Sequence, residues 1–144
     1  MMERKECTIL GDGTFQFVPV LFKQMYTFHL LIGTRSFPLF FVYSESRNKN
    51  MYMKVFEYMK NVMKIDMHKF MSDYEVAVRS AARYYYPDSI LVGCWFHFID
   101  SLIKRIKKLG LQKMYNKEKH SMKSSENMLL FVLFQLMKCQ HSMN

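Results

Sequence analysis

Residues 26 to 43 read YTFHLLIGTRSFPLFFVY, and this stretch has the pattern of a β-hairpin. Apolar and aromatic residues fill two runs, Tyr26 to Ile32 and Phe37 to Tyr43, as is typical of strands. Gly33-Thr34-Arg35 separates the runs and predicts the turn, so the two strands should be antiparallel. Pro38 lies inside the second run. Because proline cannot donate a ladder hydrogen bond, we expect this strand at an edge of the sheet.

Further elements are predicted on both sides of the hairpin. Thr8 to Leu10 is a short apolar run, and the Gly11-Asp12-Gly13-Thr14 that follows it predicts a turn. After the hairpin, apolar residues at helical spacing alternate with short strand-like runs. We expect, in order, a helix over 52–63, a strand over 67–71, a helix over 74–85, a strand over 90–92, a helix over 99–109 that stops at Gly110, and an apolar helix over 128–137.

This order of elements predicts a single α/β domain over residues 1–144. Short loops join the first three strands, which should therefore be antiparallel, whereas helices join the later strands, which should be parallel. The expected architecture is a mixed sheet with helices packed against it. No internal repeat and no Pro-, Gly- or Ser-rich linker divides the chain.

Composition narrows the class of protein. Half of the 144 residues are hydrophobic, which suits one buried core and excludes a disordered segment. Lys and Arg number 21 against 12 Asp and Glu, a net charge of +9, so polyanions such as DNA are the expected partners. Three scattered cysteines favour a reducing compartment. The N-terminus is charged and does not have the pattern of a secretory signal, and no apolar run approaches the length of about 20 residues that a membrane-spanning helix needs. We therefore expect a nuclear or cytoplasmic protein that is neither secreted nor membrane-spanning.

Two aspartates are the candidate catalytic and metal-binding residues. Asp12 follows the first predicted strand and Asp73 follows the fourth. If these strands are parallel neighbours, both carboxylates project into the crevice at the carboxyl ends of the strands. Two such oxygen ligands suit Mg²⁺ or Mn²⁺. A pair of such ions stabilises the attacking and leaving oxygens of a phosphodiester.

Each of these residues also has a purely structural interpretation. Asp12-Gly13 is a common turn dipeptide. Ser72-x-x-Glu75 is a capping-box pattern, in which Glu75 serves the next helix and Asp73 lies in its first turn. Only the joint position of both aspartates favours a metal site.

Two further groups of residues have less specific patterns. Cys94 and His97 form a Cys-x-x-His after the fifth predicted strand. Zinc needs four ligands, and the other His and Cys residues show no paired spacing, so we expect no zinc site. Eight basic residues against one acid lie between Ser101 and Ser124, which predicts either a solvated helix face or a phosphate-binding surface. They are Lys104, Arg105, Lys107, Lys108, Lys113, Lys117, Lys119 and Lys123.

Three blocks of sequence, in this order and spacing, resemble the transposase domain of the Mutator-like (MULE) family. They are Asp12-Gly13-Thr14-Phe15 with Pro19, Phe22, Gln24-Met25-Tyr26 and His29; Ser72-Asp73-Tyr74-Glu75 with Ala77; and Gly93-Cys94-Trp95-Phe96-His97-Phe98. The residues Ile106, Leu109-Gly110-Leu111 and Tyr115 are similar to the helix that follows in that family. The resemblance spans about residues 8–134.

The resemblance implies an RNase H-like fold and a DDE-type transposase that acts on DNA with Mg²⁺ or Mn²⁺. Asp12 and Asp73 match the first two acids of the family's catalytic triad. Cys94 and His97 match the family's Cys-x-x-His, whose role is unsettled.

The family's third acid is a Glu well beyond this motif, normally after a helical insertion. Neither Glu118 nor Glu126 stands in a matching context. We therefore expect a domain truncated before its third acid and inactive alone. The alternatives are a catalytically dead nucleic-acid-binding remnant and a module that binds a protein partner, or a second copy of itself, through the apolar C-terminal helix.

Overall fold

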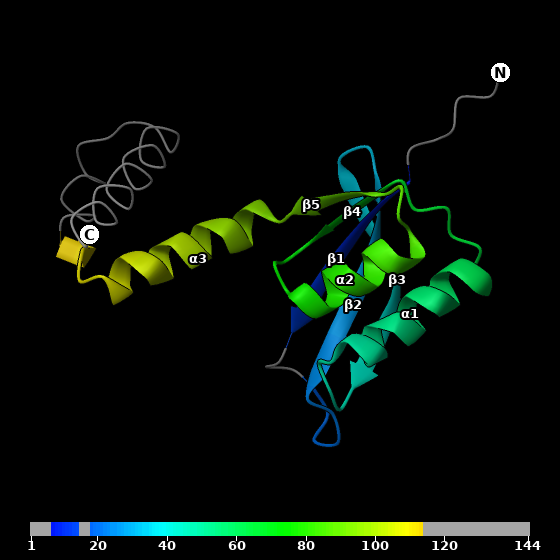
Figure 1. The fold of residues 1–144 in the computed structure, drawn as a ribbon, viewed down its shortest axis with the longest axis horizontal. Coiled ribbons are helices and arrows are strands. Elements are labelled where there is room, and N and C mark those ends of the chain that lie inside the picture. Colours follow the sequence, from blue (N-terminus) through cyan, green and yellow to red (C-terminus); the bar gives the residue numbers. More distant parts are fainter. Residues whose placement is uncertain (1–6, 15–17, 114–144) are drawn as a thin grey trace. The chain divides into compact units, whose positions relative to one another are not determined.

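The computed structural model describes residues 7–14 and 18–113. They divide between His97 and Phe98 into two compact units. The expected helix over 128–137 lies outside these ranges. The described part of the first unit contains β1 (Thr8–Thr14), β2 (Gln24–Ile32), β3 (Arg35–Ser44), α1 (Lys49–Asn61), β4 (Lys69–Ser72), α2 (Val76–Tyr85) and β5 (Ile90–Gly93) (Figure 1). The next helix, α3 (Trp95–Lys108), begins in the first unit and continues into the second.

The sheet has the strand order β3-β2-β1-β4-β5. β1 pairs with β2 and β2 with β3 in antiparallel fashion, whereas β1 pairs with β4 and β4 with β5 in parallel. The predicted mixed α/β sheet is confirmed. The edge position of the strand that contains Pro38 is confirmed as well, because β3 is the outermost strand. The β2–β3 register shifts next to this proline, so that Phe28 lies opposite Phe40 and His29 opposite Pro38.

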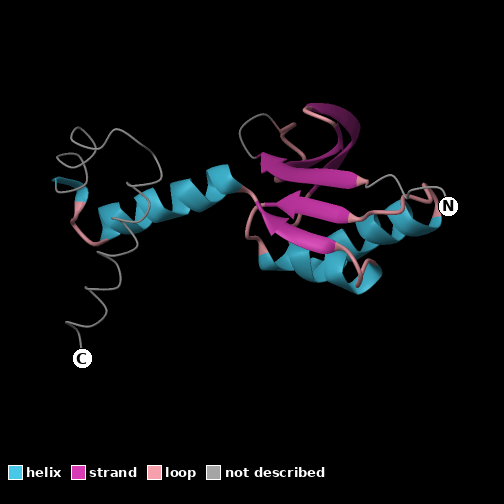
Figure 2. Ribbon diagram, turned by 90° about the horizontal axis from the view of Figure 1, so that it is seen from above, coloured by secondary structure: helices cyan, strands magenta, loops and turns pink. Residues whose placement is uncertain are grey.

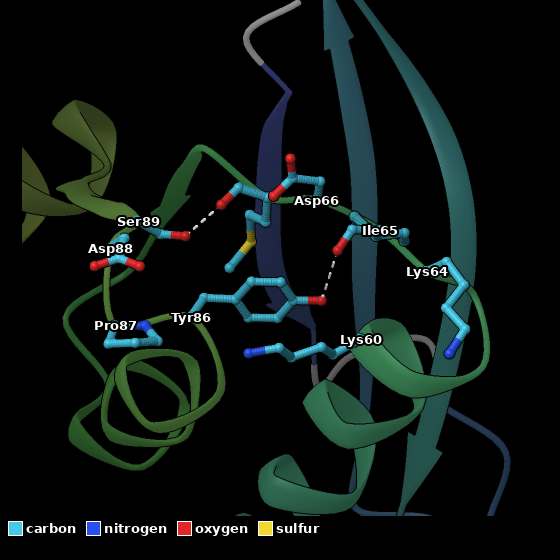
Figure 3. A pocket seen from close by; sticks show the side chains of 9 residues that line it. Lys60, Lys64, Ile65, Asp66, Tyr86, Pro87, Asp88 and Ser89 are labelled. Carbon is cyan, nitrogen blue, oxygen red and sulfur yellow. Dashed lines mark hydrogen bonds between the residues drawn. The ribbon is translucent and has the colours of Figure 1, made fainter. Parts of the chain in front are cut away.

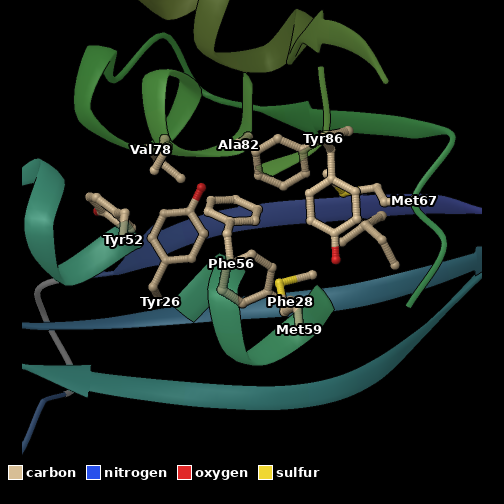
Figure 4. Close-up of a cluster of buried hydrophobic side chains, with 12 residues drawn as sticks. Tyr26, Phe28, Tyr52, Phe56, Met59, Met67, Val78, Ala82 and Tyr86 are labelled. Carbon is tan, nitrogen blue, oxygen red and sulfur yellow. The ribbon is translucent and has the colours of Figure 1, made fainter. Parts of the chain in front are cut away.

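Both helices of the first unit lie on the same face of the sheet (Figure 2). Aromatic side chains from the strands and from α1 fill the space between sheet and helices (Figure 4). Phe28 is central, since its ring lies 4.8 Å from that of Phe40, 5.0 Å from that of Tyr26 and 5.8 Å from that of Phe56. Some of the apolar residues whose helical spacing predicted the two helices are buried here, namely Tyr52, Phe56 and Met59 of α1 and Val78 and Ala81 of α2. Others of the predicted stripes, Val62, Met63 and Tyr74, are exposed and lie outside the helices.

The predicted turn over Gly11–Thr14 is wrong, because β1 continues through these residues to Thr14. Gly11 lies opposite Phe28 in the ladder, and Asp12 lies opposite Thr27. A Cβ on Gly11 would lie 2.8 Å from the Phe70 ring and from the Tyr26 hydroxyl. This glycine therefore serves close packing inside a strand rather than a turn.

The remaining boundaries differ from the prediction by a few residues. The helix expected from residue 52 begins at Lys49, where the side chain of Asn48 accepts a hydrogen bond from the amide of Met51. Gly33 in the hairpin and Gly110 after α3 have φ values of +61° and +71°, so the predicted turn and helix stop are confirmed.

Buried phenols predict a loss of stability at alkaline pH. Burial raises the pKa of Tyr86 to about 12, and burial also raises the pKa values of Tyr26 and Tyr52 above their ordinary range. In the unfolded chain these groups titrate near pH 10. Their contribution to stability is therefore complete below about pH 10 and is lost as the pH rises through the folded pKa values. Urea unfolding at increasing pH should show this decline, and ordinary phenolate titration of all tyrosines in the folded protein would contradict it.

Candidate active site

The two aspartates predicted from the sequence belong to adjacent parallel strands or follow them directly: Asp12 lies in β1, and Asp73 is the residue after β4. Leu10 of β1 is opposite Met71 of β4, so each aspartate lies two residues beyond this pair, toward the carboxyl end of its strand. Side chains alternate between the faces of a sheet, and Ile9 faces the helices, so Asp12 projects from the opposite face. The Asp12 side chain is 61% exposed. Both aspartates thus lie toward the carboxyl ends of two neighbouring inner strands of the sheet.

His97 is the third residue near these strand ends. It lies in the first turn of α3, and its Nε2 is 3.6 Å from Oδ1 of Asp12. Its other ring nitrogen, Nδ1, is buried and has no hydrogen-bond partner among the described residues. The backbone amide of Cys94 donates to the carbonyl of Ser72 at 2.7 Å. This hydrogen bond continues the pairing of β4 with β5 and fixes the backbone of Cys94 beside the residue that precedes Asp73. His97 therefore contacts the site, whereas Cys94 positions the backbone.

The predicted capping box is wrong. Ser72 is the last residue of β4 and is fully buried, and its hydroxyl donates to the carbonyl of Asp73 at 3.0 Å. α2 begins only at Val76, and its N-cap residue Glu75 makes no side-chain cap. Instead, Oδ1 of Asp73 accepts a hydrogen bond from the amide of Glu75 at 3.2 Å, an interaction that fixes the Asp73 carboxylate.

The Glu75 side chain belongs to a polar network that joins β2, α1 and the start of α2. The Tyr52 hydroxyl donates to Oε2 of Glu75 at 3.0 Å, and Nε2 of Gln24 donates to the Tyr52 oxygen at 3.1 Å. Nη2 of Arg47 lies 3.4 Å from the same Glu75 oxygen. Each bond spans more than 20 residues of sequence, so no local pattern could have predicted it. The network anchors the loop that contains Asp73 to the core.

Tyr26 of β2 belongs to the core, and its hydroxyl is within electrostatic range of the carboxylates. It is fully buried, and its hydroxyl has no hydrogen-bond partner within the described part of the chain. Burial raises the pKa of Tyr26 well above its ordinary value, and the negative charges of Asp73, Glu75 and Asp12 raise it further. The phenol is therefore neutral at physiological pH and retains a proton that it can donate.

The predicted basic residues Lys104, Arg105, Lys107, Lys108 and Lys113 are all exposed. Lys104 forms an ion pair with Asp100 one turn earlier, at 2.6 Å. These residues belong to the second unit. Lys117, Lys119 and Lys123 lie outside the described residues.

A pocket lies where the chain enters β4 and β5 (Figure 3), and neither Asp12 nor Asp73 is among its lining residues. Lys60, Asp66 and Asp88 are among its lining residues. The hydroxyl groups of this pocket form hydrogen bonds with its own backbone. The Tyr86 hydroxyl donates to the carbonyl of Ile65 at 3.1 Å, and the Ser89 hydroxyl donates to the carbonyl of Met67. Because functional crevices of such sheets lie at the carboxyl ends of the strands, the edge with Asp12 and Asp73 is the better candidate.

Comparisons with known proteins identify no family: no protein-family model matches the chain, and no curated protein matches it. Within residues 7–14 and 18–113, no group of three or more His, Cys, Asp or Glu side chains is arranged to hold a metal ion. None of the helices in these ranges is long and apolar enough to cross a membrane.

Proposed function

We propose that the chain is a DNA phosphoryl-transfer domain of the Mutator-like transposase type with an RNase H-like fold. The observation that supports this most is the position of Asp12 and Asp73 at the carboxyl edge of two adjacent parallel strands. Asp12 lies there beside the imidazole of His97, and Asp73 directly follows the neighbouring strand.

The donor groups fit a magnesium-like ion. Mg²⁺ is usually held by one or two carboxylates together with water and substrate phosphates, rather than by a complete protein cage. Asp12 is largely exposed and accessible to such an ion, and Asp73 is held in place by its bond to the Glu75 amide. Asp12 and Asp73 would therefore hold Mg²⁺ or Mn²⁺.

The residues have separate tasks in this proposal. Asp12 and Asp73 would hold the ion, which would supply Lewis-acid activation of water and stabilisation of negative charge on phosphate oxygens. His97 lies against Oδ1 of Asp12 and orients that carboxylate. The network of Tyr52, Gln24 and Arg47 holds Glu75 and with it the neighbouring Asp73. Catalysis of this type also needs a third carboxylate, which the resemblance places beyond the Cys-x-x-His.

Calorimetric titration with Mn²⁺ tests the proposal. Asp12→Asn and Asp73→Asn should each weaken Mn²⁺ binding by more than about 100-fold, because even residues that merely support a metal ligand typically contribute about 10- to 100-fold. Asparagine keeps an oxygen that can accept the Glu75 amide, so Asp73→Asn should stay folded. The matched control is Asp88→Asn, an exposed carboxylate outside the site, which should bind as the wild type does. Equal binding by all four proteins would refute the proposal.

A catalytically dead nucleic-acid-binding domain is the second candidate. The net charge of +9 and the exposed basic side chains on α3 favour it. DNA binding by a folded wild-type chain that shows no saturable Mn²⁺ binding would support this candidate over the first.

A further inference from the structure

Two aromatic side chains on β3 are exposed on the face of the sheet that bears Asp12. Phe41 is 54% exposed and Tyr43 is 46% exposed. Phe41 lies opposite Thr27, which in turn lies opposite Asp12, so these three residues form one row across β3, β2 and β1. Paired residues of a ladder project from the same face, and α1 and α2 lie on the other one (Figure 2).

We propose that Phe41 and Tyr43 form a stacking platform for unpaired bases of a nucleic-acid strand. This inference rests on the proposed function in one respect: the nucleic-acid strand whose phosphate reaches Asp12 and Asp73 is also the one whose bases stack on Phe41 and Tyr43. It names the class of substrate, which is a nucleic acid that is single-stranded next to the reacting phosphate.

The spacing of the two rings suits stacked bases. Residues two apart on a strand are separated by about 6.8 Å, so neighbouring bases can each meet one ring. Phe22 packs against Tyr43 with ring centroids 5.4 Å apart and supports that ring from the side. Asp12 and Phe41 are two strand spacings apart, about 10 Å between Cα atoms, a distance that a short piece of a strand can span.

The surroundings favour a nucleic acid over a protein partner. Thr27, His29 and Asp12 interrupt the apolar surface beside Phe41, whereas the centre of a protein interface is depleted of charged groups. Lys23 is exposed and directly precedes β2, and its backbone amide donates to the carbonyl of Ser44, the residue after Tyr43. An aromatic pair beside a cation, in a chain of net charge +9, complements a strand that exposes both bases and phosphates.

The test measures binding of the full chain to a labelled single-stranded DNA of about 12 nucleotides and to an abasic strand of equal length, in EDTA. The wild type should prefer the strand with bases. The double variant Phe41→Leu/Tyr43→Leu should lose about tenfold or more in affinity for that strand and little for the abasic one. The control, Tyr58→Leu/Tyr84→Leu, removes exposed aromatics from α1 and α2 and should bind as the wild type does. Phe41→Trp should retain the preference, because tryptophan also stacks.

Equal affinity for both strands, or an equal loss in the control, would overturn the proposal. A wild-type dimer that the double variant abolishes, without any base-dependent binding, would identify a second copy as the occupant and overturn it too. Failure of the proposed function can be distinguished from failure of this inference, because the binding of single-stranded DNA is measured without metal. Asp73→Asn should keep the preference for bases even if Mn²⁺ titration shows no site.

Discussion

Phe28→Ala is expected to remove about 3–5 kcal/mol from the free energy of unfolding. The side chain is fully buried, and its ring contacts those of Tyr26, Phe40, Phe56 and Phe70 with centroids 4.8 to 6.2 Å apart. Alanine would leave a cavity among four aromatic rings, which cannot all collapse into it. Domains of this size typically have only about 5–15 kcal/mol of total stability, so the variant should be close to unfolded.

Urea unfolding followed by circular dichroism measures this loss. Phe41→Ala is the matched control, because Phe41 is a phenylalanine of the same sheet but is exposed on the other face. It should change stability by less than about 1 kcal/mol. Similar losses in the two variants would show that the rings around Phe28 are not the centre of the core.

Gly11→Ala should cost about 1–3 kcal/mol, although alanine is otherwise the better strand residue. The new methyl group would lie 2.8 Å from the Phe70 ring and from the Tyr26 hydroxyl, both of which are buried and unable to move freely. Relief of this clash would displace the backbone next to Asp12. The same substitution should therefore weaken Mn²⁺ binding as well as stability.

A double-mutant cycle identifies the clash as the cause. In a Phe70→Leu background, the smaller side chain leaves room for the methyl group, so Gly11→Ala should cost at least about 0.5 kcal/mol less than in the wild type. Strict additivity of the two losses would contradict a direct contact between residue 11 and the ring.

Much of the fold followed from local patterns. The Gly33 turn between two apolar runs predicted the hairpin, and Pro38 predicted the edge strand. The extension of β1 was missed, because Gly11-Asp12-Gly13-Thr14 has the composition of a turn. These residues pair with Met25 to Phe28 of β2, and Gly11 leaves room for the Phe70 ring of β4 and the Tyr26 hydroxyl of β2. Local sequence contains no signal for such a contact.

The candidate site was predictable only in its outline. The sequence predicted that Asp12 and Asp73 would share a crevice if the first and fourth strands were parallel neighbours, and β1 and β4 are such neighbours. The network around Glu75 was not predictable, since Tyr52, Gln24 and Arg47 are distant in sequence. Ser72-x-x-Glu75 suggested a capping box instead, because that pattern ignores the competing hydrogen bond from Tyr52. The contact of His97 with Asp12 was not predictable either, because it depends on the position of the first turn of α3 after β5.

We expect the carboxyl ends of β1 and β4 to share one divalent cation. Paramagnetic broadening of amide signals by substoichiometric Mn²⁺, measured by NMR on the full chain, tests it most directly. The account predicts selective loss of the signals around Asp12 and Asp73 together, reversed by excess Mg²⁺ and absent in Asp73→Asn. Broadening centred on Asp66 and Asp88, or broadening at only one of the two strand ends, would contradict it.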